Sequence, residues 1–277
     1  MSLPAVGWVG LGDQGAPIAR AIAEAGYPLH AWARRPASLA ALDGVTYTAH
    51  DTVAGLGAAS DIVGLCLNED KDNRELMTKH GLLAAMRPGS VLVNHGTGLP
   101  AFAAEMTRLA AAHGIDVLDA PVSGGRAGAV ARQLTTIVGG DAAVVDRLRP
   151  LLGTFSAKVA HLGGPGAGQA GKLINNALLM ANQKNIADVL GVAQDLGIEI
   201  PALVDVLRSG SAASFALRAL GSAVTPDNAE HLRRMQLVDM DIFAEAVAGL
   251  GDRVAPVSRR AIAGAEALPL LASLVGP

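Results

Sequence analysis

Hydrophobic residues in the first 160 positions form short apolar runs separated by segments with helical periodicity. The runs lie at Ala5–Val9, Leu29–Ala33, Ile62–Leu67, Val91–Asn94, Asp116–Asp119 and Thr135–Val138. A short, continuous apolar run bounded by breakers is typical of a strand that is buried on both faces of a parallel sheet. Helical patterns separate most of the runs, for example at Pro17–Ala25, Ala101–His113 and Ala142–Leu152. This alternation predicts right-handed βαβ units and a doubly wound, parallel α/β sheet.

The alternation ends near Leu162, at the dense cluster of breakers Gly163-Gly164-Pro165-Gly166. A long helical pattern follows from about residue 169 to residue 196. Its apolar residues fall on nearly every face of the helix, which predicts a helix that is buried on all sides.

The remainder of the chain, Pro201 to Leu274, has the pattern of several shorter helices and no convincing strand. We therefore predict two domains. Residues 1–163 form a Rossmann-type nucleotide-binding domain, and residues 164–277 form an all-helical substrate and dimerisation domain, with the long helix between the two.

Composition and charge narrow the function classes. The net charge is −3 and the basic residues are scattered, so we expect no nucleic-acid partner. No apolar stretch is long enough to span a membrane, and the seven histidines show no metal-ligand spacing. Cys66 is the single cysteine, which fits a reducing, cytoplasmic location, and we expect it to be a small buried strand residue and not a nucleophile.

The segment Gly10-Leu11-Gly12-Asp13-Gln14-Gly15 fits the pattern G-x-G-x-x-G between a strand and a helix. In such a turn, one glycine permits the tight bend, one lets a diphosphate approach the backbone, and one lets helix and strand pack closely. We therefore predict that these six residues bind a dinucleotide cofactor.

The second strand indicates which dinucleotide is bound. It ends in Ala33-Arg34-Arg35 without the carboxylate that usually accepts a hydrogen bond from the ribose of NAD. An arginine can instead pair with a 2′-phosphate through two hydrogen bonds. Arg34 and Arg35 therefore predict NADP as the cofactor, with NAD as the alternative.

Lys172 and Asn176 are the candidate catalytic pair. They stand four residues apart in the long helix, so both side chains project from one face. Reduction of a carbonyl needs a proton on oxygen as well as a hydride on carbon. A lysine ammonium can polarise the carbonyl and donate that proton, and the neutral amine can accept it in the reverse direction.

Two motifs together resemble the β-hydroxyacid dehydrogenase family, which includes 3-hydroxyisobutyrate dehydrogenases and the glyoxylate and succinic semialdehyde reductases. The first motif is Asp119-Ala120-Pro121-Val122-Ser123-Gly124-Gly125, and the second is the glycine-spaced run from Gly163 to Asn176. With the glycine-rich turn near the N-terminus, the resemblance covers nearly the whole chain and extends to the 6-phosphogluconate dehydrogenase type of NAD-binding domain.

The resemblance implies a role for each matching residue. Lys172 is the catalytic lysine, Asn176 orients the substrate, and Ser123 acts with them. The residues implied to bind substrate are Ser123, Gly124 and Gly125, and those implied to contact the cofactor are Leu67, Asn68 and Thr97. It also implies a homodimer, or a dimer of dimers, in which the C-terminal helices interlock.

The chain departs from the family pattern at several positions. Gln14 replaces a methionine, Asn68 a proline, and Gly96 a serine. Near the C-terminus the family carries a Lys-Asp pair whose lysine reaches the active site. The best local match is Met240-Asp241, so we expect Met240 to face the substrate in place of a lysine, which favours a less charged substrate or a carboxylate held by other groups.

We therefore predict an NADP(H)-dependent oxidoreductase acting on a small hydroxy acid or on the corresponding aldehyde or keto compound. An imine reductase of the same fold and a non-catalytic nucleotide-binding protein are the alternatives. His95 has two interpretations, of which a loop histidine bonded to the backbone is favoured over one bonded to substrate or cofactor.

Overall fold

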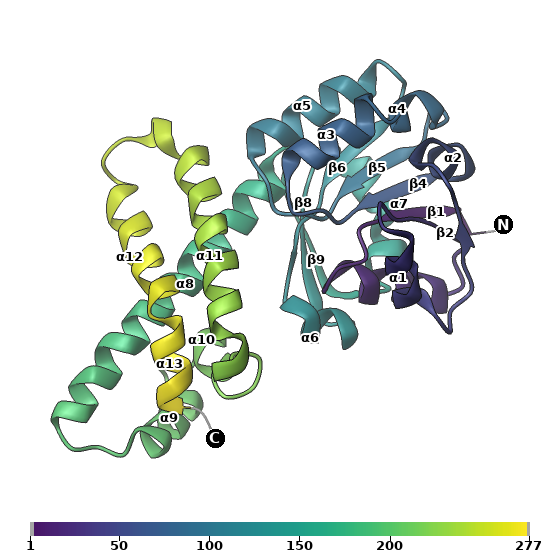
Figure 1. Ribbon diagram of the computed structural model, residues 1–277. Coiled ribbons are helices and arrows are strands. Elements are labelled where there is room, and N and C mark those ends of the chain that lie inside the picture. Colours follow the sequence, from purple (N-terminus) through teal and green to yellow (C-terminus); the bar gives the residue numbers. More distant parts are fainter. Residues whose placement is uncertain (1–2, 276–277) are drawn as a thin grey trace. The chain divides into compact units, whose positions relative to one another are not determined.

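The computed structural model describes residues 3–275 of the chain. The chain divides into two compact units, the N-terminal unit Met1–Lys172 and the C-terminal unit Leu173–Pro277, each of which is described by itself. The division falls inside α8 (Ala167–Asp195), the long helix that the sequence predicts (Figure 1). The functional boundary between residues 163 and 164 stays a prediction.

One nine-stranded sheet forms the framework of the N-terminal unit (Figure 1). The order of its strands is β3-β2-β1-β4-β5-β6-β8-β7, and β9 pairs with β8. The strands are β1 (Val6–Val9), β2 (Leu29–Trp32), β3 (Thr48–Ala49), β4 (Ile62–Leu65), β5 (Val91–Asn94), β6 (Asp116–Asp119), β7 (Val122–Ser123), β8 (Leu134–Gly139) and β9 (Ser156–Gly163).

The first six strands confirm the predicted Rossmann-type topology. Strands β1 to β6 are all parallel, and their order 3-2-1-4-5-6 is that of a dinucleotide-binding sheet. The sheet is not parallel throughout, however, because β8 runs antiparallel to both β6 and β7. The expected parallel sheet is therefore extended by a mixed edge.

Helices cover both faces of this sheet. They are α1 (Gly15–Glu24), η1 (Pro36–Leu42), α2 (Val53–Ala59), α3 (Asp70–Thr78), α4 (Leu82–Ala85), α5 (Pro100–Ala111), α6 (Gly125–Val130) and α7 (Ala142–Leu152). Trp8 and Ile18 belong to the apolar core on one face, whereas Val9 and Met106 belong to the core on the other. Because neighbouring residues of one strand point into different cores, the central strands read as continuous apolar runs.

Strand β4 ends one residue before Cys66, so the prediction of a strand residue at that position is wrong. The apolar run continues past the strand because Leu67 packs against the core from the following loop. Cys66 is only partly exposed, and burial raises the pKa of its thiol to about 12. The thiol therefore keeps its proton near neutral pH, as expected for a cysteine that is not a nucleophile.

The C-terminal unit is helical, as predicted. After α8 come α9 (Ile200–Ser209), α10 (Phe215–Ala219), α11 (Pro226–Ala246), η2 (Ala248–Leu250), α12 (Ala255–Glu266) and α13 (Leu268–Val275) (Figure 1). A Cβ on Gly264 of α12 would lie 1.7 Å from the carbonyl oxygen of Met180. Only glycine permits this close approach of the two helix backbones.

Helix α8 is buried on one side only in the single chain. Leu173 and Met180 are almost fully buried, whereas Ile174 and Leu178 are 62% and 63% exposed. The prediction of burial on all sides is therefore wrong for one copy of the chain. Among the described residues, no helix combines the length and the hydrophobicity that a membrane crossing requires.

Candidate active site

Four strand ends of the N-terminal unit lie in one row at the carboxyl edge of the sheet. Val9 pairs with Leu65, Leu65 with Asn94, and Asn94 with Asp119. The segments that follow these residues therefore emerge side by side. In open α/β sheets this edge is where ligands bind.

The glycine-rich turn after β1 has the geometry that a diphosphate requires. Gly10 has φ +100°, and a Cβ there would lie 2.1 Å from the carbonyl oxygen of Cys66. A Cβ on Gly15, the first residue of α1, would lie 2.0 Å from the carbonyl oxygen of Gly10. A Cβ on Gly12 would meet no atom within 4 Å, so its backbone is open to a ligand. The three glycines thus fit the tight bend, the close packing and the exposed backbone of a dinucleotide site.

The other residues of this turn are accessible as well. Leu11 and Gln14 are half-buried and Asp13 is exposed. Arg126, at the start of α6, has a guanidinium nitrogen 3.9 Å from the carboxylate of Asp13. A positive charge therefore lies beside the only acidic residue of the turn.

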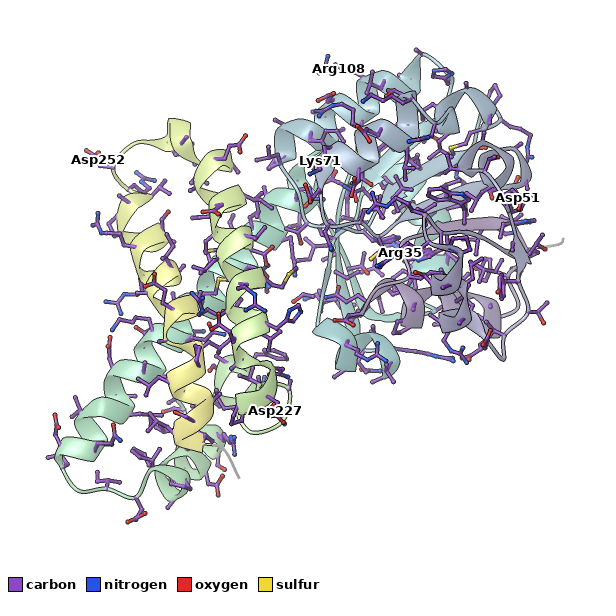
Figure 2. All side chains as sticks on the ribbon, viewed as in Figure 1. Arg35, Asp51, Lys71, Arg108, Asp227 and Asp252 are labelled. Atoms are coloured by element: carbon purple, nitrogen blue, oxygen red, sulfur yellow. The ribbon has the colours of Figure 1, made fainter. Side chains whose placement is uncertain are left out.

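Arg34 and Arg35 follow β2, where the ribose of a dinucleotide would lie, and both are exposed. Figure 2 labels Arg35 on the surface of the N-terminal unit. Arg34 forms an ion pair with Asp72, in the first turn of α3, at 3.4 Å between Nη1 and Oδ1. Sequence reasoning missed Asp72 because nothing in the linear pattern connects it with Arg34.

The loops after β4 and β5 pack tightly against each other. A Cβ on Gly96 would lie 2.1 Å from the carbonyl oxygen of Leu67. This contact leaves no room for a side chain at the position before Thr97. Leu67 and Thr97 are half-buried and Asn68 is exposed, so all three lie at accessible points of the sheet edge.

His95 is a buried structural residue. Its Nδ1–H donates to the carbonyl oxygen of Ala120 at 2.9 Å, and its ring stacks on Trp8 at 5.2 Å between centroids. Burial lowers its pKa to about 4, so the ring is neutral near pH 7. This confirms the backbone-bonded interpretation.

Asp119, at the end of β6, anchors the start of α8. Its Oδ1 accepts from the backbone N–H of Gly166 at 2.8 Å, and its Oδ2 accepts from the backbone N–H of Gln169 at 2.8 Å. Burial raises the pKa of this carboxyl, while the backbone hydrogen bonds lower it. Lys172 is half-buried and lies three residues after Gln169 on the same helix.

The Ser123-Gly124-Gly125 segment is a sharp turn in the same unit. Ser123 ends β7 and is half-buried. Gly124 and Gly125 have φ values of +129° and +62°, conformations that favour glycine. A Cβ on Gly125 would meet no atom within 4 Å, so the space beside its backbone is open. Backbone amides in such a turn can bind an anionic group.

Asn176 and Asp239 are joined within the C-terminal unit. Asn176 is buried, and its Nδ2 donates to Asp239 Oδ2 at 2.8 Å. Met240 next to it is 1% exposed and packs in an apolar cluster with Leu173 and Phe243. Met240 is therefore a core residue, and the prediction that it faces the substrate is wrong.

The hydrogen bond between Asn176 and Asp239 also revises the match to the family's Lys-Asp pair. Of the two aspartates at this place in α11, it is Asp239 that accepts the hydrogen bond from Asn176, and this favours Val238, which is 49% exposed, as the match for the lysine position. The sequence contains two aspartates at this point of the helix, and the motif alone does not distinguish them.

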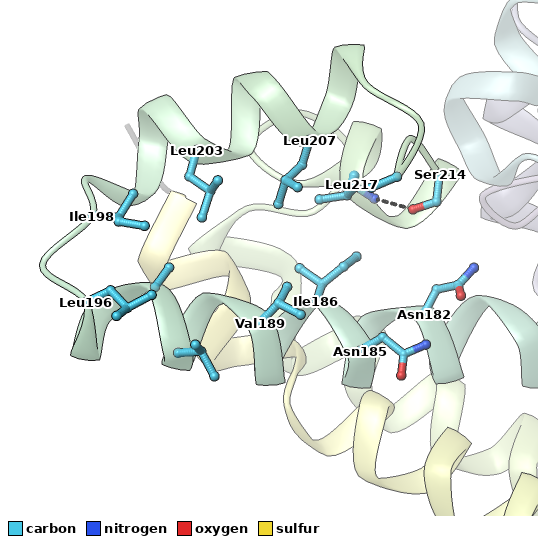
Figure 3. Close-up of a pocket in the computed structure, with 13 residues that line it drawn as sticks. Asn182, Asn185, Ile186, Val189, Leu196, Ile198, Leu203, Leu207, Ser214 and Leu217 are labelled. Atoms are coloured by element: carbon cyan, nitrogen blue, oxygen red, sulfur yellow. Dashed lines mark hydrogen bonds between the residues drawn. The ribbon is translucent and has the colours of Figure 1, made fainter.

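The C-terminal unit also carries an apolar cleft of about 460 Å³ between α8 and α9 (Figure 3). Ile186 and Val189 line it from α8, Leu196 from the residue directly after α8, and Leu203 and Leu207 from α9. None of the predicted catalytic residues is among its lining residues. Within residues 3–275, no group of three or more His, Cys, Asp or Glu side chains is placed to hold a metal ion.

Comparison with known proteins finds two families, one for each part of the chain. Residues 5–163 match the NAD-binding domain of 6-phosphogluconate dehydrogenase. Residues 166–259 match a family described as the NAD-binding of NADP-dependent 3-hydroxyisobutyrate dehydrogenase.

Individual relatives agree with these families. The chain is 33% identical to 2-(hydroxymethyl)glutarate dehydrogenase of Eubacterium barkeri, over 77% of this chain and 71% of that protein. It is 34% identical to the NAD-dependent L-serine dehydrogenase of Pseudomonas aeruginosa, over 76% and 72%. Among solved structures, 3-hydroxyisobutyrate dehydrogenase of Mycobacterium tuberculosis, determined with L-serine, has a TM-score of 0.85 at 28% identity, with 98% of both chains covered.

Proposed function

The chain belongs to the β-hydroxyacid dehydrogenase family, whose members are NAD(P)-dependent oxidoreductases acting on CH–OH groups, and we propose that it interconverts a small hydroxy acid and its aldehyde or keto form with NADP(H). Lys172 is the general acid and base in this proposal.

The observation that carries the proposal is the anchoring of the lysine helix at the cofactor edge of the sheet. Asp119 ends β6 in the row of strand ends that also includes Val9, and the glycine-rich turn starts directly after Val9. The hydrogen bonds from Gly166 and Gln169 attach the first turn of α8 to Asp119. Lys172 follows one turn later, so it emerges from a helix that starts beside the nucleotide site.

Each residue has a distinct task in the proposed reaction. When bound, the nicotinamide supplies or accepts the hydride. Lys172 donates a proton to the substrate oxygen during reduction and removes it during oxidation. The amides of the Ser123–Gly125 turn bind the substrate's anionic group. Asn176, held by Asp239, orients the substrate through its remaining amide hydrogen-bonding capacity.

The preference for NADP rests on Arg34 and Arg35. Both are exposed where the adenosine ribose would lie, and no carboxylate stands between Trp32 and Pro36. A 2′-phosphate would therefore meet two cations and no repelling acid from β2 itself.

For the substrate, we propose a 3-hydroxy acid whose hydroxyl is a primary alcohol. L-Serine, 3-hydroxyisobutyrate and 2-(hydroxymethyl)glutarate, named for the relatives above, all carry a CH2OH group on the carbon next to a carboxylate. Val238 takes the place of the lysine cation here, so the carboxylate would depend on the Ser123–Gly125 turn. We expect weaker binding of such acids than in a relative that keeps the lysine.

The test is a turnover screen of purified protein with NADPH and with NADH, monitored at the absorbance of the reduced nicotinamide. The panel contains 3-hydroxy acids, short aldehydes, 2-keto acids and cyclic imines. We expect turnover on hydroxy acids and aldehydes and a higher kcat/KM with NADPH. Turnover restricted to imines would instead support the imine reductase, and NADPH binding without any turnover would support a non-catalytic protein.

The role of Lys172 is tested with Lys172→Ala on the best substrate of the screen. Loss of a general acid and base lowers kcat by about 100- to 10,000-fold. Lys158→Ala, at an exposed position of β9, is the matched control and should leave kcat unchanged. A Lys172→Ala variant with wild-type kcat would refute the mechanism.

We further propose that two copies associate through α8. Ile174, Leu178, Val189 and Val192 are all at least half exposed on this helix in one chain. Exposed apolar residues on this scale are typical of a subunit interface. Light scattering after gel filtration should give a molecular mass of at least twice the 28.0 kDa of one chain. Val192→Asp should reduce this mass. A monomeric wild type would refute the interface.

A further inference from the structure

The loop that carries Thr97 is held by the helix that carries Lys172. The side chain of Gln169, in the first turns of α8, is buried and bonds to both sides of this loop. Its Nε2 donates to the carbonyl oxygen of Gly96 at 2.7 Å, and its Oε1 accepts from the N–H of Gly98 at 2.9 Å. One amide side chain therefore satisfies a backbone acceptor and a backbone donor that flank Thr97 on either side.

Gln169 is itself fixed by its own backbone. Its N–H donates to Asp119 Oδ2, and Asp119 Oδ1 accepts from Gly166. The backbone next to it packs closely against the sheet, because a Cβ on Gly168 would lie 2.5 Å from the carbonyl oxygen of Asp119. The end of β6 thus determines where the first turn of α8 lies and, through Gln169, where the loop after β5 lies.

The loop is clamped from its other side as well. Asn94 Oδ1 accepts from the N–H of Gly96 at 3.0 Å, and Asp70 Oδ2 accepts from the N–H of Leu99 at 2.9 Å. These contacts attach the loop to β5 and α3, whereas Gln169 alone among these side chains attaches it to α8. Loss of Gln169 would therefore release the loop from the lysine helix without releasing it from the sheet.

We propose that Gln169 is a positioning residue that sets the distance between the cofactor contact at Thr97 and the proton donor at Lys172. Lys172 lies three residues after Gln169, so the two side chains project from neighbouring positions on one face of α8. Any rotation or shift of this turn moves Lys172 with respect to Thr97. A displacement of about 1 Å in such an arrangement can lower the rate about 100-fold, because hydride and proton transfer need the reacting groups aligned together. The proposal rests on the roles given above to Lys172 and Thr97.

The first test needs neither cofactor nor substrate. Hydrogen–deuterium exchange of the apo protein is measured at the amides of residues 95–99 in wild type and in Gln169→Met. The methionine side chain has a volume similar to that of glutamine but makes neither of the hydrogen bonds to Gly96 and Gly98. We expect the Gly98 amide to exchange at least 10-fold faster in the variant. Gln194→Met, at an exposed position of the same helix, is the control and should exchange like wild type.

The second test separates positioning from a loss of folded protein. On the best substrate, Gln169→Met should lower kcat at least 10-fold while the KM for the cofactor changes less than 3-fold, because the glycine-rich turn and Arg34 are untouched. The readout is the primary isotope effect on kcat, measured with reduced cofactor that carries deuterium at the transferred position. If Gln169 had a merely structural role, its loss would lower the amount of active enzyme without raising this isotope effect. We expect that isotope effect to increase, since a misplaced reaction step becomes rate-limiting.

Gln169→Glu keeps the length of the side chain and the acceptor for Gly98 but, when ionised, lacks the donor for Gly96. We expect its exchange rate and kcat to lie between those of wild type and Gln169→Met, and it replaces that variant if Gln169→Met does not fold. Wild-type exchange at residues 95–99 together with wild-type kcat in the folded variants would overturn the proposal. Failure of the substrate screen would refute the proposed function alone, since the exchange measurement on the apo protein is independent of turnover.

Discussion

Two glycines of the same turn should respond in opposite ways to an added methyl group. Gly12 and Gly15 are three residues apart in the glycine-rich turn. The Cβ of Gly12→Ala would meet no protein atom within 4 Å, whereas the Cβ of Gly15→Ala would lie 2.0 Å from the carbonyl oxygen of Gly10. The first substitution therefore intrudes only on the ligand, and the second intrudes on the protein.

The expected magnitudes follow from these distances. An overpacked contact costs about 1–3 kcal/mol, so Gly12→Ala should weaken NADPH binding about 5- to 150-fold at about 1.4 kcal/mol per tenfold. Its stability should stay equal or rise by about 0.4–1 kcal/mol, because alanine restricts the unfolded chain. Gly15→Ala forces backbone against backbone and should cost about 3 kcal/mol. In a unit of this size that cost lowers Tm by about 6–12 °C.

The assays are fluorescence titration with NADPH and thermal unfolding of the apo protein. Gly249→Ala is the control, since its Cβ would also meet nothing within 4 Å and it lies in the C-terminal unit. If Gly12→Ala bound NADPH as tightly as wild type, the diphosphate would not approach this backbone. If Gly15→Ala had the same Tm as wild type, the close packing of the turn would not limit the stability of the unit.

Three further outcomes are expected. In the folded protein the His95 ring has a pKa of about 4, whereas in the unfolded chain it takes up a proton below pH 6.5. The free energy of unfolding should therefore fall by up to about 3 kcal/mol as the pH drops through this window. In urea titrations, the free energy of unfolding of His95→Gln should depend less on pH than that of wild type. Arg34→Ala and Arg35→Ala should each lower the ratio of kcat/KM for NADPH over NADH about 10-fold, by loss of a charge-assisted hydrogen bond to the 2′-phosphate; an unchanged ratio in both would remove the basis for NADP preference. Met240→Lys should destabilise the C-terminal unit by several kcal/mol because it buries a cation. Val238→Lys should fold normally and lower the KM for a carboxylate substrate. A stable Met240→Lys variant with a lowered KM, together with no change of KM in Val238→Lys, would restore Met240 as the site residue.

The parts of the fold that could be predicted are those with a strong local cause. Strands β1, β4, β5 and β6 are buried on both faces and therefore read as apolar runs. Strand β3 has both residues exposed, and β9 lies at an edge with few buried residues. Such strands depend on hydrogen bonds to a neighbour and have no apolar pattern of their own.

The site shows the same division. The glycine-rich turn is recognisable because each glycine meets a backbone requirement within a few residues. The error at Met240 arose because Asp239 and Asp241 stand two residues apart, so that the family's Lys-Asp pair can be aligned in two ways. Only the hydrogen bond from Asn176 to Asp239 selects one of them. Gln169 and Asp72 were missed because their partners are distant in sequence: the bonds of Gln169 to the loop after β5 span 71 and 73 residues.

Trp8 and Trp32, the two tryptophans of the chain, both lie in the nucleotide-binding unit. Trp8 is buried, and its Nε1–H donates to the carbonyl oxygen of Gly10 at 3.0 Å, so its indole is bonded directly to the glycine-rich turn. Intrinsic emission of the unlabelled protein therefore originates in this unit alone. Indole emission therefore reports unfolding of the N-terminal unit alone, whereas far-UV circular dichroism sums the helices of both units. An unfolding transition seen by circular dichroism but not by indole emission would belong to the C-terminal unit. Energy transfer from indole to reduced nicotinamide gives a direct optical signal for cofactor occupancy.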